Sequence, residues 1–398
     1  MTDIVTTNYL IIGGGLEGLA IAWSLADRGE TGILVVERDT LCSGMTGKSS
    51  GVVRAHYGNP SLAAMSWYGV QVFEKAQELF DDDMAFHQCG YVVGVAENNI
   101  EPLRKNVAMM QGIGVEVDLI AHDKMAELWP SLHLDDFAAF AYEPRGGRGE
   151  AYMAGMGFAA AARRKGVKIK QSTRVVELLR SADGSVHGAK LASGDEIHAG
   201  TVILATGPWA PQLTAPLGFD LDVKAQRAQL VLIDQGEPAP VSPVLSDLAG
   251  LSYICREPNG ELLVGNSDHQ APQYIDPDNY INRADEDTFE KIVTKMGHRL
   301  PDMPDPRITS SYVGAYDVTP DYNPIIGPSP VDGLFLATGF SGHGFKMSPA
   351  VGKLVADLVT DGVTTLPDVE PRDFRFSRFE ENDLLLSLNP YEGAGEMR

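Results

Sequence analysis

Residues 9–37 read YLIIGGGLEGLAIAWSLADRGETGILVVE, and this stretch decides the fold. Residues 9–12 form a short apolar run that predicts a strand, and a glycine-rich turn follows it. Residues 16–28 then predict an apolar helix that Gly29 ends, and residues 33–37 predict a second buried strand. This order of strand, turn, helix and strand is a β-α-β unit with the lengths that a parallel sheet requires.

Three glycines in this turn follow the pattern G-x-G-x-x-G. Gly13 allows the tight turn, Gly15 lets a pyrophosphate approach the backbone, and Gly18 lets the helix pack closely on the strand. Glu37 ends the next strand, at about the 20-residue separation where a carboxylate accepts hydrogen bonds from ribose hydroxyls. A carboxylate there repels a 2′-phosphate, so the pattern disfavours NADP and does not choose between NAD and FAD.

The composition excludes several classes of protein. The chain has 398 residues, with 32 basic and 54 acidic side chains, and its formal charge of −22 argues against nucleic acid or an anionic membrane as a partner. Its 44% apolar and 22% charged residues are typical of a globular protein. The three cysteines form no C-x-x-C pair, so we predict reduced thiols in a cytoplasmic protein and no metal site. Glycines and Glu17 interrupt the apolar residues 9–26, so we expect no membrane span.

The rest of the chain alternates between helical and strand-rich segments. We predict helices at residues 61–80, 101–111, 152–165 and 283–296. Strands predicted between residues 166 and 207 continue the first sheet, and residues 222–312 form a second strand-rich region. Residues 333–359 predict a strand, a loop and a helix in that order. Because sheet-type pieces occur at the beginning, middle and end, the pattern predicts two domains that the chain crosses several times.

Two later motifs favour FAD over NAD. Residues 201–207, TVILATG, predict a buried strand that ends in small residues, where the backbone of Ala205 and Gly207 can pass beside an extended cofactor. Residues 339–346, GFSGHGFK, join another strand to a helix whose amides can face the electron-rich end of a reduced flavin ring.

These motifs resemble those of the FAD-dependent D-amino acid oxidase (DAO) superfamily, specifically its sarcosine oxidase and sarcosine oxidase β-subunit branch. The resemblance covers most of the chain, and its motifs occur in the order found in the family. They are GGGLEGLAIAWSLA with Glu37 and Arg38, TGKSSGVVRAHYG, ATGPWAPQL, YDVTPDYNPIIGP and GFSGHGFKMSPAVGK. The resemblance implies an α/β fold, α+β overall, with a Rossmann-like FAD-binding domain of the GxGxxG type and a substrate domain whose mainly antiparallel sheet roofs the flavin.

The family also implies how the chain is divided. We predict that the FAD-binding domain comprises residues 1–84, 150–221 and 313–398, the last segment including a C-terminal tail. The substrate domain is predicted at residues 85–149 and 222–312. Residues 374–387 of the tail either cover the FAD-binding domain or meet another subunit.

The resemblance implies a set of site residues. Arg54 and Lys346 match the positions that hold the substrate carboxylate in relatives that oxidise N-methyl amino acids, and a buried carboxylate needs such cations. A lysine in a first helical turn opposes the helix dipole, which favours a functional role for Lys346. Tyr316 and His343 match residues of the same pocket, where neutral imidazole can orient the substrate or assist loss of the amine proton. The residues predicted to bind FAD are Gly13, Gly15, Gly18, Glu37, Arg38, Ser49, Ser50, Val175, Ala205, Gly207, Gly339, Gly342, His343, Gly344 and Lys346.

Three positions depart from the simple sarcosine oxidases. Those enzymes attach FAD through a cysteine where this chain has Gly314, so we expect FAD to be non-covalent here. Leu263 stands in place of a lysine that assists the reaction with dioxygen, and Gly51 in place of a residue that is often basic. Fewer cations near the flavin stabilise superoxide less, so both dioxygen and a partner redox protein stay open as the electron acceptor. Four further residues either reach the pocket or, as we expect, have an ordinary packing role: His56, Tyr57, Trp67 and Tyr253.

Three functions are compatible with this resemblance. The leading hypothesis is FAD-dependent oxidation of a small amino acid or N-methylated (secondary or tertiary) amine that carries a carboxylate, by hydride transfer to flavin N5 and hydrolysis of the imine. The second replaces the amine by an alcohol, as in 2-hydroxy acid dehydrogenases, with His343 as the base. The third is the flavin subunit of a heteromeric amine dehydrogenase that passes electrons to a partner. A homo-oligomer and a hetero-oligomer both stay open.

Overall fold

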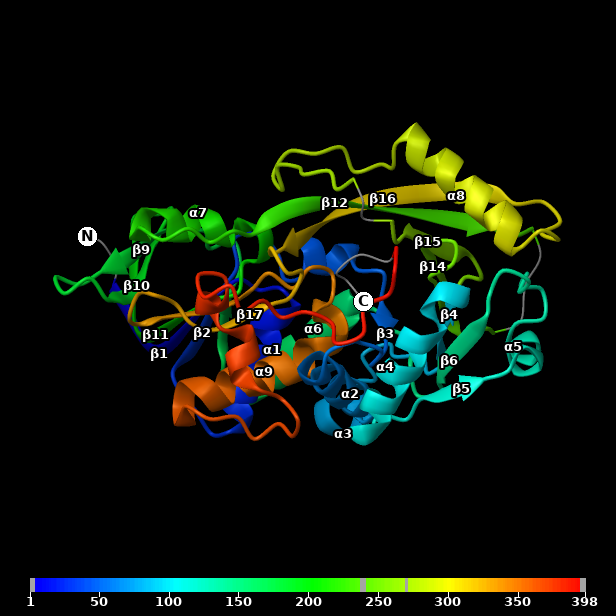
Figure 1. Ribbon diagram of the computed structural model, residues 1–398. Helices are drawn as coiled ribbons and strands as arrows, with labels where there is room; N and C mark the ends of the chain where they lie inside the picture. Colours follow the sequence, from blue (N-terminus) through cyan, green and yellow to red (C-terminus); the bar gives the residue numbers. More distant parts are fainter. Residues whose placement is uncertain (1–3, 237–240, 269–270, 394–398) are drawn as a thin grey trace.

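Two large sheets stand side by side and share one hydrophobic core (Figure 1). A computed structural model describes residues 4–236, 241–268 and 271–393. Across these residues, no helix is both long and apolar enough to cross a membrane.

The first sheet has a parallel centre. Its strands are β1 (Ile4–Ile12), β2 (Ile33–Val36), β8 (Lys168–Lys170), β9 (Val175–Arg180), β10 (Val186–Leu191), β11 (Glu196–Leu204), β17 (Ile325–Pro328) and β18 (Leu334–Thr338). They follow the order β17-β18-β11-β1-β2-β8, in which β17 alone runs antiparallel to its neighbour. β10 pairs antiparallel with β9 and β11, so the strands predicted between residues 166 and 207 do continue this sheet.

The register of the central strands brings the first motif together. The last residue of β1, Ile12, pairs with the last residue of β2 on one side and of β11 on the other. Gly13, Glu37 and Ala205 directly follow these strands, so they emerge at the same carboxyl edge, where ligands of parallel α/β sheets bind. The amide of Gly13 donates to the Val36 carbonyl at 2.9 Å and so extends the pairing by one residue.

The central strands are apolar throughout because both of their faces are buried. Ile11 and Val35 point into the core beneath the helices, whereas Ile12 and Val36 point into a second core on the opposite face. The helices α1 (Leu16–Asp27), α6 (Ala151–Arg164) and α9 (Gly344–Asp361) pack together on the first face. The short helix α7 (Ala210–Thr214) packs with β9 on the other.

The second sheet is mainly antiparallel, as the family resemblance predicted. Its strands are β4 (Tyr91–Val95), β5 (Asp118–Ile120), β6 (Ala139–Glu143), β12 (Lys224–Asp234), β13 (Val244–Asp247), β14 (Ser252–Arg256), β15 (Leu262–Asn266) and β16 (Arg307–Val318). Their order is β16-β12-β15-β14-β13-β4-β6-β5, and only β13 and β4 pair in parallel among the described strands. A separate two-stranded antiparallel ribbon consists of β3 (Val52–Val53) and β7 (Gly147–Arg148). In the chain, β3 precedes β4 and β7 follows β6.

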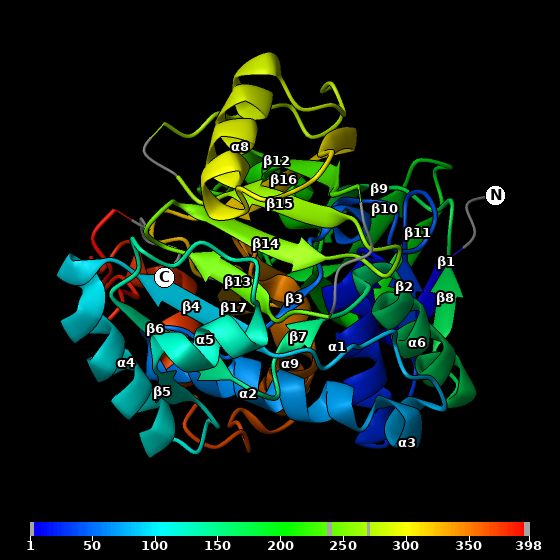
Figure 2. The same cartoon turned by 90° about the vertical axis from the view of Figure 1, so that its right-hand side faces the viewer.

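The two faces of the second sheet have different neighbours. Leu230, Val244 and Leu263 point into the core that is shared with the first sheet. Alternate residues point outward and are covered by α8 (Glu286–Arg299), which crosses the far face in Figure 2, and by α5 (His122–Leu128). The sheet is therefore fixed over the carboxyl edge of the first sheet by apolar contacts on its inner side.

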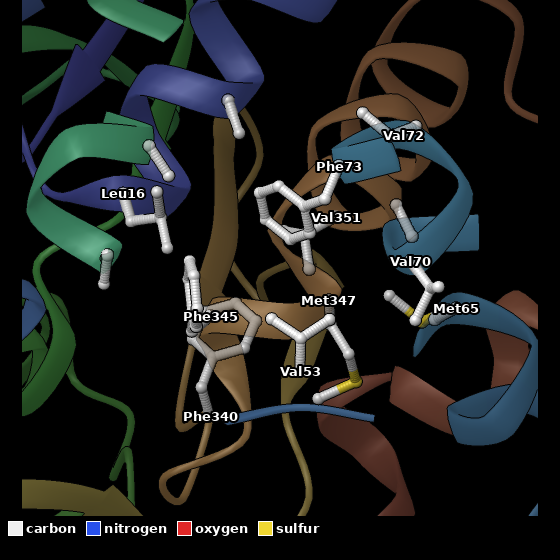
Figure 3. Packing of buried hydrophobic residues seen from close by; sticks show 14 of the residues in the cluster. Leu16, Val53, Met65, Val70, Val72, Phe73, Phe340, Phe345, Met347 and Val351 are labelled. Atoms are coloured by element: carbon white, nitrogen blue, oxygen red, sulfur yellow. The ribbon is translucent and has the colours of Figure 1, made fainter. Parts of the chain in front are cut away.

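The remaining helices complete the shared core, and the first of them packs on α9. They are α2 (Pro60–Glu74), α3 (Ala76–Phe80) and α4 (Ile100–Gly112), so the helix predicted at residues 61–80 is in fact two helices that meet at Lys75. Figure 3 shows Phe73 of α2 against Val351 and Phe345 of α9, and the Phe73 and Phe345 rings are 5.3 Å apart. Gly69 lets α2 approach α9 closely, because a Cβ there would lie 1.8 Å from the Lys346 carbonyl oxygen.

The structure bears on one predicted domain boundary and on the C-terminal tail. β16 runs unbroken from Arg307 to Val318, so the predicted boundary between residues 312 and 313 falls within a strand of the second sheet. The other segment boundaries stay predictions. Residues 374–387 begin by covering β17, where Phe374 and Arg378 are fully buried.

Candidate active site

The glycine-rich turn makes close backbone contacts that only glycine permits. Gly13 has φ +113°, and a Cβ there would lie 2.2 Å from the Ala205 carbonyl oxygen. A Cβ on Gly18 would lie 2.0 Å from the Gly13 carbonyl oxygen, so this glycine sets the close packing of α1 on β1. Thr46 Oγ1 accepts a hydrogen bond from the Leu16 amide at 3.0 Å and thereby satisfies one amide of the first turn of α1. The N-terminal end of the α1 dipole lies at the cavity described next, which Gly15, Leu16 and Glu17 line.

A cavity of about 290 Å³, the main cavity, begins at this turn and runs between the two sheets. Its lining includes Ala228 and Leu230 of β12 and residues 314–317 of β16, besides the edge of the first sheet. Of the residues predicted to bind FAD, the lining contains Gly13, Gly15, Glu37, Arg38, Ser49, Ser50, Val175, Ala205, Gly207, Gly342 and Gly344. Gly18, Gly339, His343 and Lys346 lie outside the lining.

At one end of the main cavity, backbone amides fix the position of Glu37 and side chains fix that of Arg38. The carboxylate of Glu37 accepts hydrogen bonds from the amides of Gly14 at 2.8 Å and Asp39 at 2.9 Å. The Arg38 guanidinium stacks over the Trp209 ring at 4.2 Å and donates to Asp278 at 2.8 Å. Trp209 donates to the same Asp278 oxygen at 2.9 Å, so Asp278 holds Arg38 and Trp209 together.

The other end of the main cavity lies under β16 and at the start of α9. Gly314, Tyr316, Gly342, Gly344 and Phe345 line it. A Cβ on Gly314 would lie 2.9 Å from the Lys48 Cβ, so even the start of a cysteine side chain is crowded at this position. Gly342 has φ +82°, and a Cβ there would lie 2.8 Å from the Tyr316 ring. The backbone of β16 at Gly314 and the backbone before α9 at Gly342 therefore both lie directly at the cavity.

Two buried carboxyl groups face this end. Burial and the nearby charge of Asp317 raise the pKa of Glu17 well above its usual range. The positive charge of Lys346 lowers this pKa, but by less. Burial raises the pKa of Asp317 to about 6, although that carboxylate accepts a hydrogen bond from the Gly339 amide at 2.8 Å. Glu17 Oε2 is inaccessible and has no hydrogen-bond partner among the described residues. Such an atom on a cavity wall suits a ligand that can hydrogen-bond to it.

Three of the four predicted catalytic residues meet at Tyr57 rather than in the lining of the main cavity. The Arg54 guanidinium lies 4.2 Å from the centre of the Tyr57 ring, and Lys346 Nζ lies 6.0 Å from it. The imidazole of His343 packs edge-on to the same ring at 5.2 Å. We name Tyr57 with Arg54, His343 and Lys346 the Tyr57 cluster. All four side chains are buried, and Tyr57 was expected only to pack.

A buried acid stands behind Arg54. Glu143, at the end of β6, accepts a hydrogen bond from the Ala55 amide at 2.7 Å, and its other oxygen is 3.7 Å from His56 Nδ1. Burial raises the pKa of Glu143 to about 7, against the opposing effects of the Ala55 amide and Arg54. Burial lowers the pKa of Arg54, but Tyr57, Tyr91 and Glu143 outweigh it, so this pKa rises and the guanidinium stays charged. Nothing in the sequence around Glu143 marks it, because its partners are 88 residues away in the chain.

The fourth catalytic candidate, Tyr316, lines the main cavity from above. Tyr253, on β14, shares a hydrogen bond with it, and burial together with Tyr316 raises the pKa of the Tyr253 phenol well above its usual value. Trp67 was expected to pack, and its ring lies 4.5 Å from the Arg145 guanidinium, away from the main cavity. Gly51 has φ +72° and a Cβ there would lie 2.1 Å from the Gly149 carbonyl oxygen, so a basic side chain does not fit at this position.

One group of metal-ligand types occurs among the described residues, far along the chain from these motifs. His133, Asp136 and His298 offer ligand atoms within 4.8 Å of one another. Arg299 donates to both oxygens of the Asp136 carboxylate, at 2.7 and 2.9 Å, so an arginine already compensates this charge.

The family described as FAD dependent oxidoreductase, DAO, matches residues 8–358. The chain belongs to the DAO family. This membership confirms the fold class and the cofactor that the motifs implied, so this DAO protein is a FAD-dependent oxidoreductase.

Known relatives of this DAO protein match along nearly its whole length. 4-Methylaminobutanoate oxidase (formaldehyde-forming) of Paenarthrobacter nicotinovorans is 27% identical over 98% of this chain, which spans only 48% of that relative. Sarcosine oxidase subunit beta of Arthrobacter sp is 26% identical, with 95% of this chain and 92% of the relative covered. The crystal structure of L-proline dehydrogenase from P. horikoshii superposes with a TM-score of 0.86 at 26% identity, over 96% of this chain and all of the other.

The main cavity fits FAD in its chemistry. The glycine turn and the start of α1 suit the pyrophosphate, and Glu37 suits the ribose hydroxyls. Glu17 and the glycines at the start of α9 line the other end, where they would contact the flavin ring.

Proposed function

We propose that this DAO-family enzyme oxidises a small amino acid or N-methylated amino acid, with FAD as the hydride acceptor. The proposal rests chiefly on one observation: two cations, Arg54 and Lys346, are both buried at the ring of Tyr57. A substrate carboxylate placed beside this ring would receive charge-assisted hydrogen bonds from both cations. The relatives named 4-methylaminobutanoate oxidase and sarcosine oxidase subunit beta support the same class of substrate.

The acids near these cations leave room for an anionic substrate. The pKa of Glu143 is about 7 and that of Glu17 is well above its usual range, in both cases because the carboxyl is buried. Burial thus favours the uncharged form of both carboxyl groups, which weakens their competition with a substrate anion for Arg54 and Lys346. The substrate carboxylate then makes charge-assisted hydrogen bonds in a region that excludes water.

The remaining steps assign a role to each neighbouring side chain. FAD, when bound, accepts a hydride from the carbon next to the amine nitrogen, and water hydrolyses the resulting imine. His343, beside Tyr57, orients the amine and takes up its proton when neutral, and Tyr316 closes the pocket from the second sheet. We further propose that FAD is held without a covalent bond at residue 314, where glycine offers no thiol.

Anaerobic reduction of the flavin tests the substrate class. Glycine, N-methylglycine, dimethylglycine, proline and 4-methylaminobutanoate are mixed with the enzyme beside lactate and glycerate, and bleaching of the flavin band is followed. We expect an amino acid to bleach it, and Arg54→Met to raise the Kd of that amino acid by about 30-fold or more. Bleaching by the hydroxy acids alone, or an unchanged Kd in Arg54→Met, would contradict the proposal.

We propose a partner redox protein, rather than dioxygen, as the principal electron acceptor. Leu263 is buried among apolar residues, and Gly51 leaves no room for a cation. The resemblance to a sarcosine oxidase subunit beta supports a partner chain. Reoxidation of the reduced enzyme in air, timed by stopped flow, should be slow compared with its reduction, whereas rapid production of hydrogen peroxide would identify an oxidase.

A further inference from the structure

The C-terminal clasp, residues 385–392, crosses from the first-sheet half of the molecule to the second. It starts from a buried anchor in which Arg378 donates to both oxygens of Asp321, at 2.7 and 2.9 Å. The Leu385 amide donates to the same carboxylate at 3.0 Å, and the Leu385 carbonyl accepts from Asn323 at 2.7 Å. The first residue of the clasp is therefore fixed before the chain leaves the β17 region.

Buried asparagines at and just before α4 receive the clasp. Asn106 donates to the Asn389 carbonyl at 2.9 Å and accepts from the Asn389 side chain at 3.1 Å. Asn99 accepts from the Glu392 amide at 2.8 Å and donates to the Glu392 carbonyl at 3.1 Å. Asn99 and Asn106 are 1% and 0% exposed. Buried amides are unfavourable unless they are hydrogen-bonded, so these positions are suited to holding this segment.

The clasp also seals the loop that carries Arg54. The Leu388 amide donates to the Gly58 carbonyl at 2.7 Å. A Cβ on Gly58 would lie 1.8 Å from Ser387 Oγ, so the contact requires glycine at this position.

Tyr391 carries the clasp to the residues behind Arg54. Its hydroxyl is 2.7 Å from His56 Nε2, and its ring stacks on the imidazole with centroids 6.1 Å apart. The other imidazole nitrogen faces Glu143 at 3.7 Å, and the Arg54 guanidinium donates to the His56 carbonyl. Tyr391 is 3% exposed, so this chain of contacts is shielded from water.

We propose that Tyr391 is a positioning residue for carboxylate binding, which acts by holding His56, and through it Glu143 and Arg54, in place. This inference rests on the proposed role of Arg54 as the carboxylate-binding cation. The Tyr391 hydroxyl fixes one imidazole nitrogen and the Tyr391 ring packs on the imidazole, which holds His56 and so the backbone carbonyl to which Arg54 is bonded. A small displacement of a substrate-binding cation weakens binding severely, because charge-assisted hydrogen bonds depend on geometry.

The charged and titratable groups around the contacts between Tyr391 and Arg54 come from several elements. Arg54, His56 and Tyr57 belong to the loop after β3, Glu143 to β6, Tyr91 to β4 and Tyr391 to the clasp. Only Arg54 among them is a permanent cation. A change at Tyr391 is therefore expected to act on the binding of anions and to leave FAD binding unaffected.

The test compares substrates with and without a carboxylate. Tyr391→Phe keeps the ring and removes the hydroxyl. We expect the Kd of N-methylglycine, measured by anaerobic titration of the flavin, to rise about fivefold to tenfold, with kcat within twofold of wild type. Dimethylamine, the same amine without the carboxylate, should show no change, and L-proline with pyrrolidine provides a second pair. Asn98→Ala is the matched control, because Asn98 bonds only the exposed Glu392 side chain of the clasp at 2.9 Å.

Each outcome decides between two separate hypotheses. An equal effect of Tyr391→Phe on both members of a pair, or no effect while Arg54→Met weakens carboxylate binding, overturns the positioning role and leaves the proposed function intact. If Arg54→Met also has no effect, the proposed function fails. Should Tyr391→Phe not retain FAD, Asn106→Ala loosens the clasp from α4 instead, and the inference requires the same selective rise in Kd.

Discussion

The main cavity and the Tyr57 cluster are built in opposite ways. The cavity begins at residues that directly follow three paired strands, so a short motif places its backbone. The cluster gathers side chains from the loop after β3 and from the start of α9, which are nearly 300 residues apart in the chain, and Glu143 supports it from the second sheet. The cavity thus depends on backbone geometry, and the cluster on tertiary packing and electrostatics. Changes to each should have separable effects.

The largest effect is expected in the main cavity. In Gly18→Val the added side chain would begin 2.0 Å from the Gly13 carbonyl oxygen, so α1 must move away from β1. We expect purified protein with almost no FAD and a Tm lower by about 10 °C or more. The FAD absorbance per chain and thermal unfolding measure both changes.

Gly112→Ala is the matched control, since a Cβ there meets nothing within 4 Å. It should retain full FAD. If Gly18→Val also retained FAD, the close contact of α1 with the turn would not be essential to the cavity.

A second change should affect the cluster and spare the cavity. Tyr57→Leu removes the ring that Arg54 and Lys346 both face, and a close cation–ring contact is worth about 2 kcal/mol when water is excluded. We expect the Kd of N-methylglycine to rise about tenfold to 30-fold while the FAD content stays constant.

Trp67→Leu removes a similar ring, which packs on Arg145 outside the cluster. It should leave the Kd of N-methylglycine unchanged in the same anaerobic titration. Equal effects of both substitutions would mean that lost packing, and not the position of the cations, weakens binding.

The third prediction concerns pH. The pKa of Glu143 is about 7, so the group is mostly protonated below pH 7 and becomes a carboxylate beside Arg54 above it. The carboxylate competes with the substrate anion, so the Kd of N-methylglycine should rise about threefold to tenfold from pH 6 to pH 8. In Glu143→Gln this part of the pH dependence should disappear, and a profile that stayed as steep would assign it to another group.

The smallest expected effect is on the stability of the FAD-free protein. The pKa of Glu17 in the folded chain is raised, so folding favours its protonated form. The stability that this provides is fully present below the unfolded pKa of about 4.3 and is lost as pH rises through the folded pKa. Glu17→Gln should therefore raise the Tm by about 2–4 °C at pH 8 and by less at pH 5. Equal shifts at both pH values would argue against ionisation of Glu17 as the cause.

The residues that the sequence identified and those that it missed differ in a physical way. Gly13, Gly18 and Glu37 are readable because the tight turn, the close helix and the ribose hydrogen bonds impose a residue type at a fixed spacing. Tyr57 and Glu143 carry no such spacing. Their roles depend on which strands and helices pack around them, and neither the periodicity nor the composition of the sequence predicts that packing.

The sequence by itself determined the FAD-binding half of this protein, because a β-α-β unit with three glycines and a terminal acid admits few structures. It also predicted Arg54, Lys346 and His343 through the family resemblance. Only the tertiary structure brought these three to the ring of Tyr57, placed Glu143 behind Arg54 and laid Tyr391 on His56. The physical reason is that charge compensation between buried groups acts through space, over distances that the order of residues in the chain does not record.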